Sequence, residues 1–121
     1  MIRIVLYKDD DGSVPVRDFL DSVSEKAKAK LLVRLGRLRE LGHQLRRPEA
    51  DFLCDGIYEL RMKLGHVNYR LLYFFHGNVA AVLACGFTKQ DQVPPVEIEQ
   101  AKQRKAKFER TPQAHSNQEQ E

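Results

Sequence analysis

The chain has 121 residues, and its 42% hydrophobic and 31% charged residues are typical of a globular domain rather than a fibrous or wholly disordered chain. No stretch approaches the ~18 consecutive apolar residues that a membrane span needs, so a membrane-spanning protein is not expected. The net charge of +3 is mildly basic, which permits an anionic partner without requiring one.

The two cysteines, Cys54 and Cys85, have neither the spacing of a metal site nor that of a secreted disulfide framework. The opening sequence MIRIVLYKDDDG has too short an apolar run for a signal peptide. We therefore expect free thiols and a cytoplasmic location without a membrane.

The first half of the chain predicts a strand followed by a helical hairpin. Residues Ile2–Tyr7 are rich in β-branched side chains and end at a DDDG turn, which indicates a strand. A proline at the first helical position predicts a short helix over Pro15–Val23. Ser22 and Glu25 have capping-box spacing, so a longer helix is expected to begin there and to end at Gly42. Its apolar residues recur at helical spacing: Ala27, Leu31, Leu35 and Leu38.

The second half predicts a loop, three strands, a helix and a tail. The polar segment Gln44–Asp55 is expected to be the loop, and the strands are expected at Ile57–Leu64, Val67–Phe75 and Val79–Phe87. Gly65-His66 and Gly77-Asn78 suit tight hairpin turns, because glycine accepts positive φ. A helix is expected from Pro94–Pro95 to about Arg110.

The element order is therefore β-α-α-β-β-β-α, which predicts an α+β fold. We expect a single domain over residues 1–110, in which a mainly antiparallel twisted sheet packs on the helical hairpin. The tail over residues 111–121 has no apolar anchor and is expected to be disordered.

Strand alternation predicts that one face of the first hairpin is apolar and the other is charged. A two-residue Gly65-His66 loop pairs Leu64 with Val67, and this register then pairs Met62, Leu60 and Tyr58 with Tyr69, Leu71 and Tyr73, all apolar or aromatic. The opposite, open face has Lys63 across from Asn68, Arg61 across from Arg70 and Glu59 across from Leu72. A Gly77-Asn78 turn would place Cys85 across from Arg70, and Lys89 leans to the same face.

Two interpretations of this basic face remain open. Antiparallel sheets often solvate one face, and Glu59 could neutralise Arg61 in an ordinary surface pair. Alternatively, the cations form an anion-binding site. Arg70 favours the second interpretation, because it is expected on the central strand and should be destabilising directly opposite Arg61.

Four segments together resemble one known family: YELR, NYRLLYFF, VAAVLACGFTKQ and PPVEIEQAKQRKAKF. The chain resembles the RelE/ParE toxin superfamily over about residues 2–110, and most closely its HigB-like and phage-derived branch. The resemblance implies a RelE-like fold and a toxin of a type II toxin–antitoxin pair. It further implies mRNA cleavage in the ribosomal A site without a metal or other cofactor. The implied partners are a cognate antitoxin of helix-turn-helix type, the ribosome and mRNA.

The resemblance also implies catalytic residues. The arginine of ELR is Arg61, the arginine of YR is Arg70, and the lysine after the last strand is Lys89. Lys63 completes a basic pair with Arg61. We predict that Arg70 clamps the phosphate with help from Arg61, since a guanidinium binds two phosphate oxygens and keeps its charge. Lys63 or Lys89 would transfer protons.

Three further residues are predicted to bind substrate: Asn68, Phe74 and Cys85. Phe74 could stack on a base or pack in the core, and Cys85 stands where many HigB-like relatives have histidine, although a packing role is favoured for it. Two other departures from the family are Gln90, where relatives often have a basic residue, and the absence of any tyrosine after Tyr73.

Basic residues also crowd two predicted helices, as solvated faces or as ribosomal RNA contacts. One group lies on the last helix over residues 102–110, and the other comprises Lys26, Lys28, Lys30, Arg34, Arg37 and Arg39. Two alternative functions stay open beside the nuclease. One is a ParE-like inhibitor of DNA gyrase, and the other is an RNA- or protein-binding module without catalytic activity.

Overall fold

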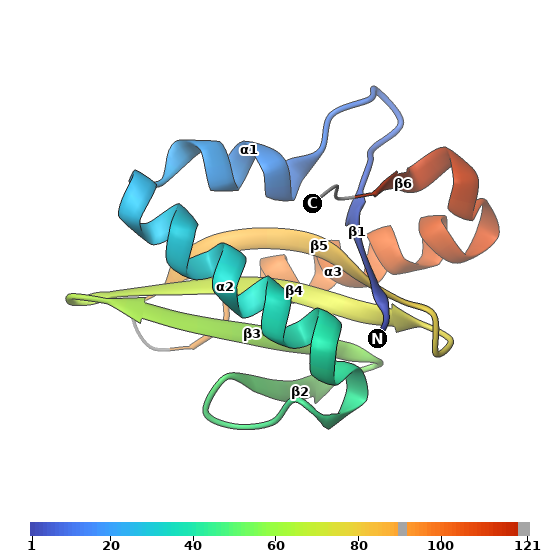
Figure 1. The fold of residues 1–121 in the computed structure, drawn as a ribbon. Helices are drawn as coiled ribbons and strands as arrows, with labels where there is room; N and C mark the ends of the chain where they lie inside the picture. Colours follow the sequence, from blue (N-terminus) through green and yellow to red (C-terminus); the bar gives the residue numbers. More distant parts are fainter. Residues whose placement is uncertain (90–91, 119–121) are drawn as a thin grey trace.

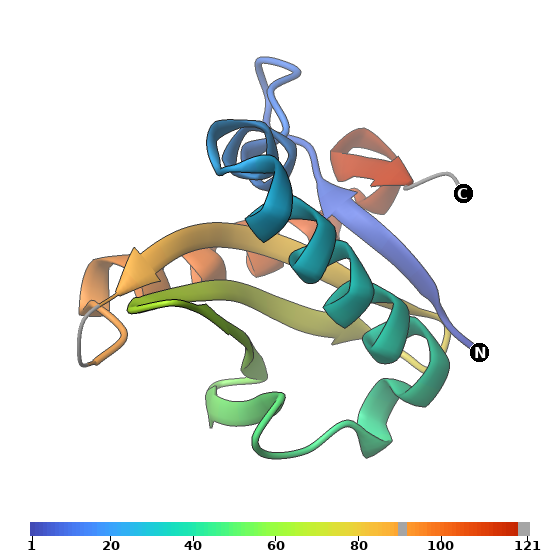
Figure 2. The same cartoon turned by 60° about the vertical axis from the view of Figure 1, so that its left-hand side comes forward.

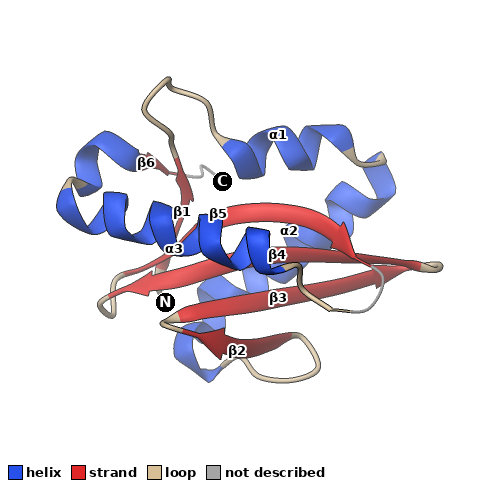
Figure 3. Cartoon of the chain, turned by 180° about the vertical axis from the view of Figure 1, so that it is seen from behind, coloured by secondary structure: helices blue, strands red, loops and turns tan. Residues whose placement is uncertain are grey.

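The computed structural model describes residues 1–89 and 92–118. A six-stranded sheet lies between two helical layers, with α2 crossing one face and α3 the other (Figures 1 and 3). The strand order is β2-β3-β4-β5-β1-β6, in which β1 pairs parallel to β5 and all other pairs are antiparallel. The elements are β1 (Arg3–Tyr7), α1 (Pro15–Ser22), α2 (Glu25–Leu41), η1 (Gly42–Gln44), β2 (Ala50–Cys54), β3 (Ile57–Leu64), β4 (Val67–His76), β5 (Ala80–Lys89), α3 (Pro95–Arg110), η2 (Pro112–His115) and β6 (Ser116–Gln118). The predicted α+β, RelE-like fold class is confirmed.

The helical hairpin forms where predicted, but its second helix begins differently. The N-cap of α2 is Ser24, whose hydroxyl accepts a hydrogen bond of 3.1 Å from the backbone N–H of Ala27. The predicted cap, Ser22, is instead the last residue of α1, and its hydroxyl donates to the carbonyl of Phe19. The predicted apolar face of α2 is buried against the sheet: Ala27, Leu31, Leu35 and Leu38.

The register of the β3–β4 hairpin is confirmed at every predicted pair. Leu64 pairs with Val67 across the two-residue turn, and the pairing continues without a shift to Tyr58 and Tyr73. Gly65 at the turn has φ of +62°. The apolar face of the hairpin packs under α1 and α2, as expected.

The β4–β5 pairing differs from the prediction in two places. His76 pairs with Ala80, so three residues rather than two form the turn, and a bulge shifts the register again between Leu72 and Tyr73. Cys85 therefore lies across from Leu72, and Arg70 lies across from Phe87. The predicted Cys85–Arg70 pair is wrong because the turn contains one extra residue and the bulge adds another on β5.

Two strands were not predicted. Residues 44–55, expected to be a loop, contain β2, which pairs with β3 at the edge of the sheet. Residues 112–118, expected to be disordered, form η2 and β6, and β6 pairs with β1 at the other edge. His115 anchors this segment, because its buried ring stacks on Tyr7 at 5.2 Å between centroids. Residues 119–121 of the predicted tail lie outside the described residues.

Helix α3 covers part of the sheet face that was expected to be open. Phe74 packs edge-on against Phe108 of α3 with 5.6 Å between ring centroids, and Leu72 and Cys85 join the same apolar cluster. The charged residues of β3 and β4 lie on the same face, beyond the end of this cluster. Among the described residues, no helix is long and apolar enough to cross a membrane.

Two glycines provide a matched test of how α1 packs on β5. A Cβ at Gly86 would lie 2.5 Å from the ring of Phe19 in α1, whereas a Cβ at Gly36 in α2 would meet no atom within 4 Å. We expect Gly86→Ala to lower the free energy of unfolding by about 1–3 kcal/mol through overpacking. Gly36→Ala should raise it by about 1 kcal/mol, because alanine favours a helix more than glycine does. Urea unfolding of both variants checks this, and equal effects would contradict the packing of α1 on β5.

Candidate functional site

The charged residues gather at one end of the sheet. Figure 2 shows the tip of the β3–β4 hairpin beside the C-terminal end of β5. At this end Arg61 of β3 lies across from Arg70 of β4, while Asn68 of β4 lies across from both Lys63 and Lys89. The structure thus brings together the four cations that the sequence singled out.

A buried carboxylate lies at the centre of this group. The side chain of Glu59 is only 1% exposed. Its Oε1 accepts a hydrogen bond of 2.9 Å from Nε of Arg61, and its Oε2 accepts one of 2.9 Å from Nε of Arg70. Nζ of Lys89 lies 3.3 Å from the same Oε2. We call Glu59, Arg61, Arg70 and Lys89 the Glu59 network.

The network continues to the edge strand through Arg61. Nη2 of Arg61 lies 3.2 Å from Asp51 of β2, whose carboxylate also binds Arg47 at 2.8 Å. The hydrogen bond from Arg47, with the nearby charge of Arg61, holds the pKa of Asp51 below its usual range. The backbone of Arg61 is fixed too, because its carbonyl accepts a 2.8 Å hydrogen bond from Nε of Arg34 in α2.

Exposure separates the cations into two kinds. The side chains of Arg70 and Lys89 are 12% and 10% exposed, and that of Arg61 is 30% exposed. Lys63 is exposed, and within residues 1–89 and 92–118 it has no ion-pair partner. Lys63 is therefore the cation of this group that is most accessible to a ligand.

Two predicted substrate-binding residues are buried elsewhere. Phe74 has no exposed surface, so a nucleic-acid base cannot stack on it, and the structure gives it the alternative role in the core. Cys85 is 2% exposed and lies 3.4 Å from Nη1 of Arg104 in α3. Burial raises the pKa of its thiol to about 11. Cys85 therefore has the packing role that was favoured for it.

From the sequence, the role considered for Glu59 is a weak surface pair with Arg61. Alternation on β3 already placed Glu59 on the same face as Arg61, two residues away. Its burial could not be read from this pattern, because it depends on α3, which packs on this face, and on β2, which pairs beside β3. The signal that was available is the pairing of Arg61 with Arg70, which requires a counter-ion. Gln90, a noted departure from the family, lies outside the described residues.

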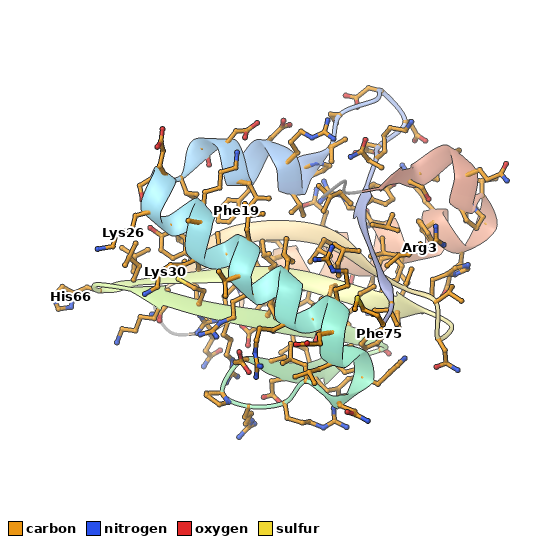
Figure 4. The ribbon with its side chains drawn as sticks, in the orientation of Figure 1. Arg3, Phe19, Lys26, Lys30, His66 and Phe75 are labelled. Carbon is orange, nitrogen blue, oxygen red and sulfur yellow. The ribbon has the colours of Figure 1, made fainter. Side chains whose placement is uncertain are left out.

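Most basic residues of the two helices have acidic partners. Glu49 binds both Arg34 and Arg37 at 2.8 Å, and Lys107 of α3 binds Asp10 at 2.9 Å. Lys26 and Lys30 differ, because both are exposed and extend from α2 on the side of the molecule where His66 marks the hairpin tip (Figure 4). In the described part of the chain, no three His, Cys, Asp or Glu side chains are grouped to hold a metal ion.

The comparison with known proteins identifies the family. Residues 18–106, well over half of the chain, match the family described as "Phage derived protein Gp49-like (DUF891)". The chain belongs to this family. The Gp49-like family is part of the RelE/ParE-like toxin superfamily, so the resemblance is confirmed at that level. No curated protein matches the chain in sequence. The match includes the whole Glu59 network.

The different burial of the two cysteines gives a direct test of how α3 covers Cys85 beside the Glu59 network. At pH 8 a thiol with a pKa of about 11 is a thiolate in about one molecule in a thousand, and Cys85 is also shielded by α3. We expect the native protein to release one equivalent of thionitrobenzoate quickly from Ellman's reagent, through the half-buried Cys54. The second equivalent should appear only in denaturant. Cys54→Ser should remove the fast phase, and a fast phase that persists in this variant would contradict the burial of Cys85.

Proposed function

We propose that this Gp49-like protein is the toxin of a type II toxin–antitoxin pair, of the HigB-like kind, and a ribosome-dependent mRNA endonuclease. The observation that supports it best is the Glu59 network, in which Arg61, Arg70 and Lys89 gather beside the accessible Lys63. Such a cluster of cations suits a phosphodiester anion. The enzyme would act in the cytoplasm, where a cognate antitoxin of helix-turn-helix type would inhibit it.

The chemistry requires groups that this site contains. The ribose 2′-hydroxyl loses its proton and attacks the adjacent phosphorus, and the bond to the 5′-oxygen breaks as that oxygen gains a proton. The products carry a 2′,3′-cyclic phosphate and a 5′-hydroxyl. Negative charge accumulates on the phosphorane oxygens, where fixed guanidinium groups stabilise it most.

Each cation has a proposed role that follows from its position. Arg70 lies on a central strand and is held by Glu59, so it would clamp the phosphate, and Arg61 would assist from the neighbouring strand. Lys63 is exposed, and its amine would reach the reacting oxygens to transfer a proton. Lys89 would stabilise charge, because it is largely buried against Glu59. Asn68 would contribute its amide between the two lysines.

One observation favours a second candidate, an inhibitor of DNA gyrase that binds without catalysis. The chain has no tyrosine after Tyr73, although RelE-like enzymes often place a catalytic tyrosine in the C-terminal segment. The buried ion pairs of the Glu59 network would then be structural. A supercoiling assay with gyrase, run on the same protein preparation, distinguishes this candidate from the nuclease.

The test is a cell-free translation reaction with purified protein, in which primer extension maps new 5′ ends of the mRNA. We expect in-frame ends that carry a 5′-hydroxyl and require ribosomes. Arg70→Ala and Arg61→Ala should reduce their formation at least 100-fold, since each removes a transition-state contact of about 3 kcal/mol. Arg17→Ala on α1, an exposed arginine on the other face of the sheet, is the matched control and should cleave normally.

Thermal unfolding of the same variants separates catalysis from folding. Arg61→Ala and Arg70→Ala must keep a cooperative transition for their activity to be interpreted. Cleavage by both variants at the wild-type rate would refute the assignment of the site. Intact mRNA with the wild-type protein, together with inhibited supercoiling, would support the gyrase candidate instead.

A further inference from the structure

Glu59 is an unusual residue for the centre of a phosphate-binding site. It is the one carboxylate side chain that is buried among the described residues, and it carries the same sign of charge as the ligand that the cations would bind. Burying a carboxylate costs free energy unless partners compensate its charge. Here three cations do so, and the network still has a net charge of +2.

The geometry of the carboxylate resembles that of the proposed ligand. Its Oε1 accepts a hydrogen bond from Arg61, and its Oε2 accepts one from Arg70 and forms an ion pair with Lys89. A phosphodiester likewise shares one negative charge between two oxygens bonded to the same atom, and guanidinium groups bind carboxylates and phosphates in the same way. Glu59 therefore satisfies the donors that a phosphodiester would use.

We propose that Glu59 is a positioning residue, an internal counter-ion that holds Arg61, Arg70 and Lys89 together in the absence of RNA and releases part of this pairing to a phosphodiester as RNA binds. The proposal rests on the proposed function, because it assigns the ligand of the same site. Arg61 would change partner most readily, since it is the most exposed of the three cations and Asp51 already binds its outer nitrogen.

Two consequences follow from competition between Glu59 and phosphate. The carboxylate weakens RNA binding, since some of its ion pairs with the cations must break before those cations can bind the phosphate. The carboxylate also stabilises the apo fold, since Arg61 and Arg70 lie directly opposite each other and would otherwise repel. Removing its charge should therefore make the fold depend on an external anion and should tighten RNA binding.

The test uses the full chain with Glu59→Gln, which keeps the shape of the side chain and removes its charge. Thermal unfolding is measured in sodium chloride and in sodium phosphate at equal ionic strength. In chloride, we expect the unfolding temperature of the variant to be well below that of the wild type. In phosphate, the variant should recover much of this difference, while the unfolding temperature of the wild type should change little. This arm reports on inorganic phosphate alone.

A second arm measures binding of a 2′-O-methyl single-stranded RNA, which cannot be cleaved, over a range of salt concentrations. We expect Glu59→Gln to bind several-fold more tightly, with a slope of log K against log salt that is steeper by about 0.7 for each phosphate gained. The double variant Glu59→Gln/Arg61→Gln restores the net charge of the network. It should show neither the phosphate rescue nor the tighter binding.

Equal or weaker RNA binding by Glu59→Gln, or no specific effect of phosphate, would overturn the proposal. A variant that fails to fold in both salts would do the same, because phosphate would then be unable to replace the carboxylate. Failure of the proposed function gives a different result: the wild type would leave mRNA intact in the translation reaction, whatever the variant does in these two assays.

Discussion

The carboxylate of Glu59 lies between two arginines that the β3–β4 register places opposite each other. Like charges at directly paired positions destabilise a sheet, so Arg61 and Arg70 need a negative group within hydrogen-bonding distance of both. Glu59 meets this requirement from the adjacent position on the same face of β3, with 2.9 Å to each Nε. Lys89 contacts the same carboxylate, so this one side chain holds three of the four cations at this end of the sheet.

The surrounding layers explain why the contact is buried. Helix α3 packs on Phe74 and Cys85 and covers the sheet beside the network, while β2 lies next to β3 in the sheet and contributes Asp51. Burial strengthens each ion pair, because less water screens it, but it also makes an unpaired charge costly. Ion pairs from three strands therefore hold the cations of the network beside one another.

The fold was largely predictable because its signals are local. Gly65-His66 defined a two-residue turn, and strand alternation then gave the whole β3–β4 register. The predicted β4–β5 register was wrong because a three-residue turn and a bulge each added one residue, and neither leaves a clear pattern in the sequence. The two shifts together move the β5 register by two residues. Side chains alternate with a period of two, so Lys89 still lies on the predicted face. The short polar strand β6 was missed because its pairing with β1 depends on backbone hydrogen bonds and on the stacking of His115.

The site was predictable as a set of residues but not as a structure. Alternation alone places Arg61, Lys63, Arg70 and Lys89 on one face, whereas burial depends on helices that pack from elsewhere in the chain. This is why Phe74 and Cys85, which share the face, are core residues under α3.

The sequence left two interpretations of the basic face, one with Glu59 neutralising Arg61 and one with an anion site. The structure makes them compatible, because Glu59 pairs with Arg61 and also gathers two further cations, which leaves the group with a charge of +2. A surface pair would be screened and would fix nothing. A buried carboxylate instead keeps several donors converged on one point, where a phosphate that took over part of the pairing would find them already gathered.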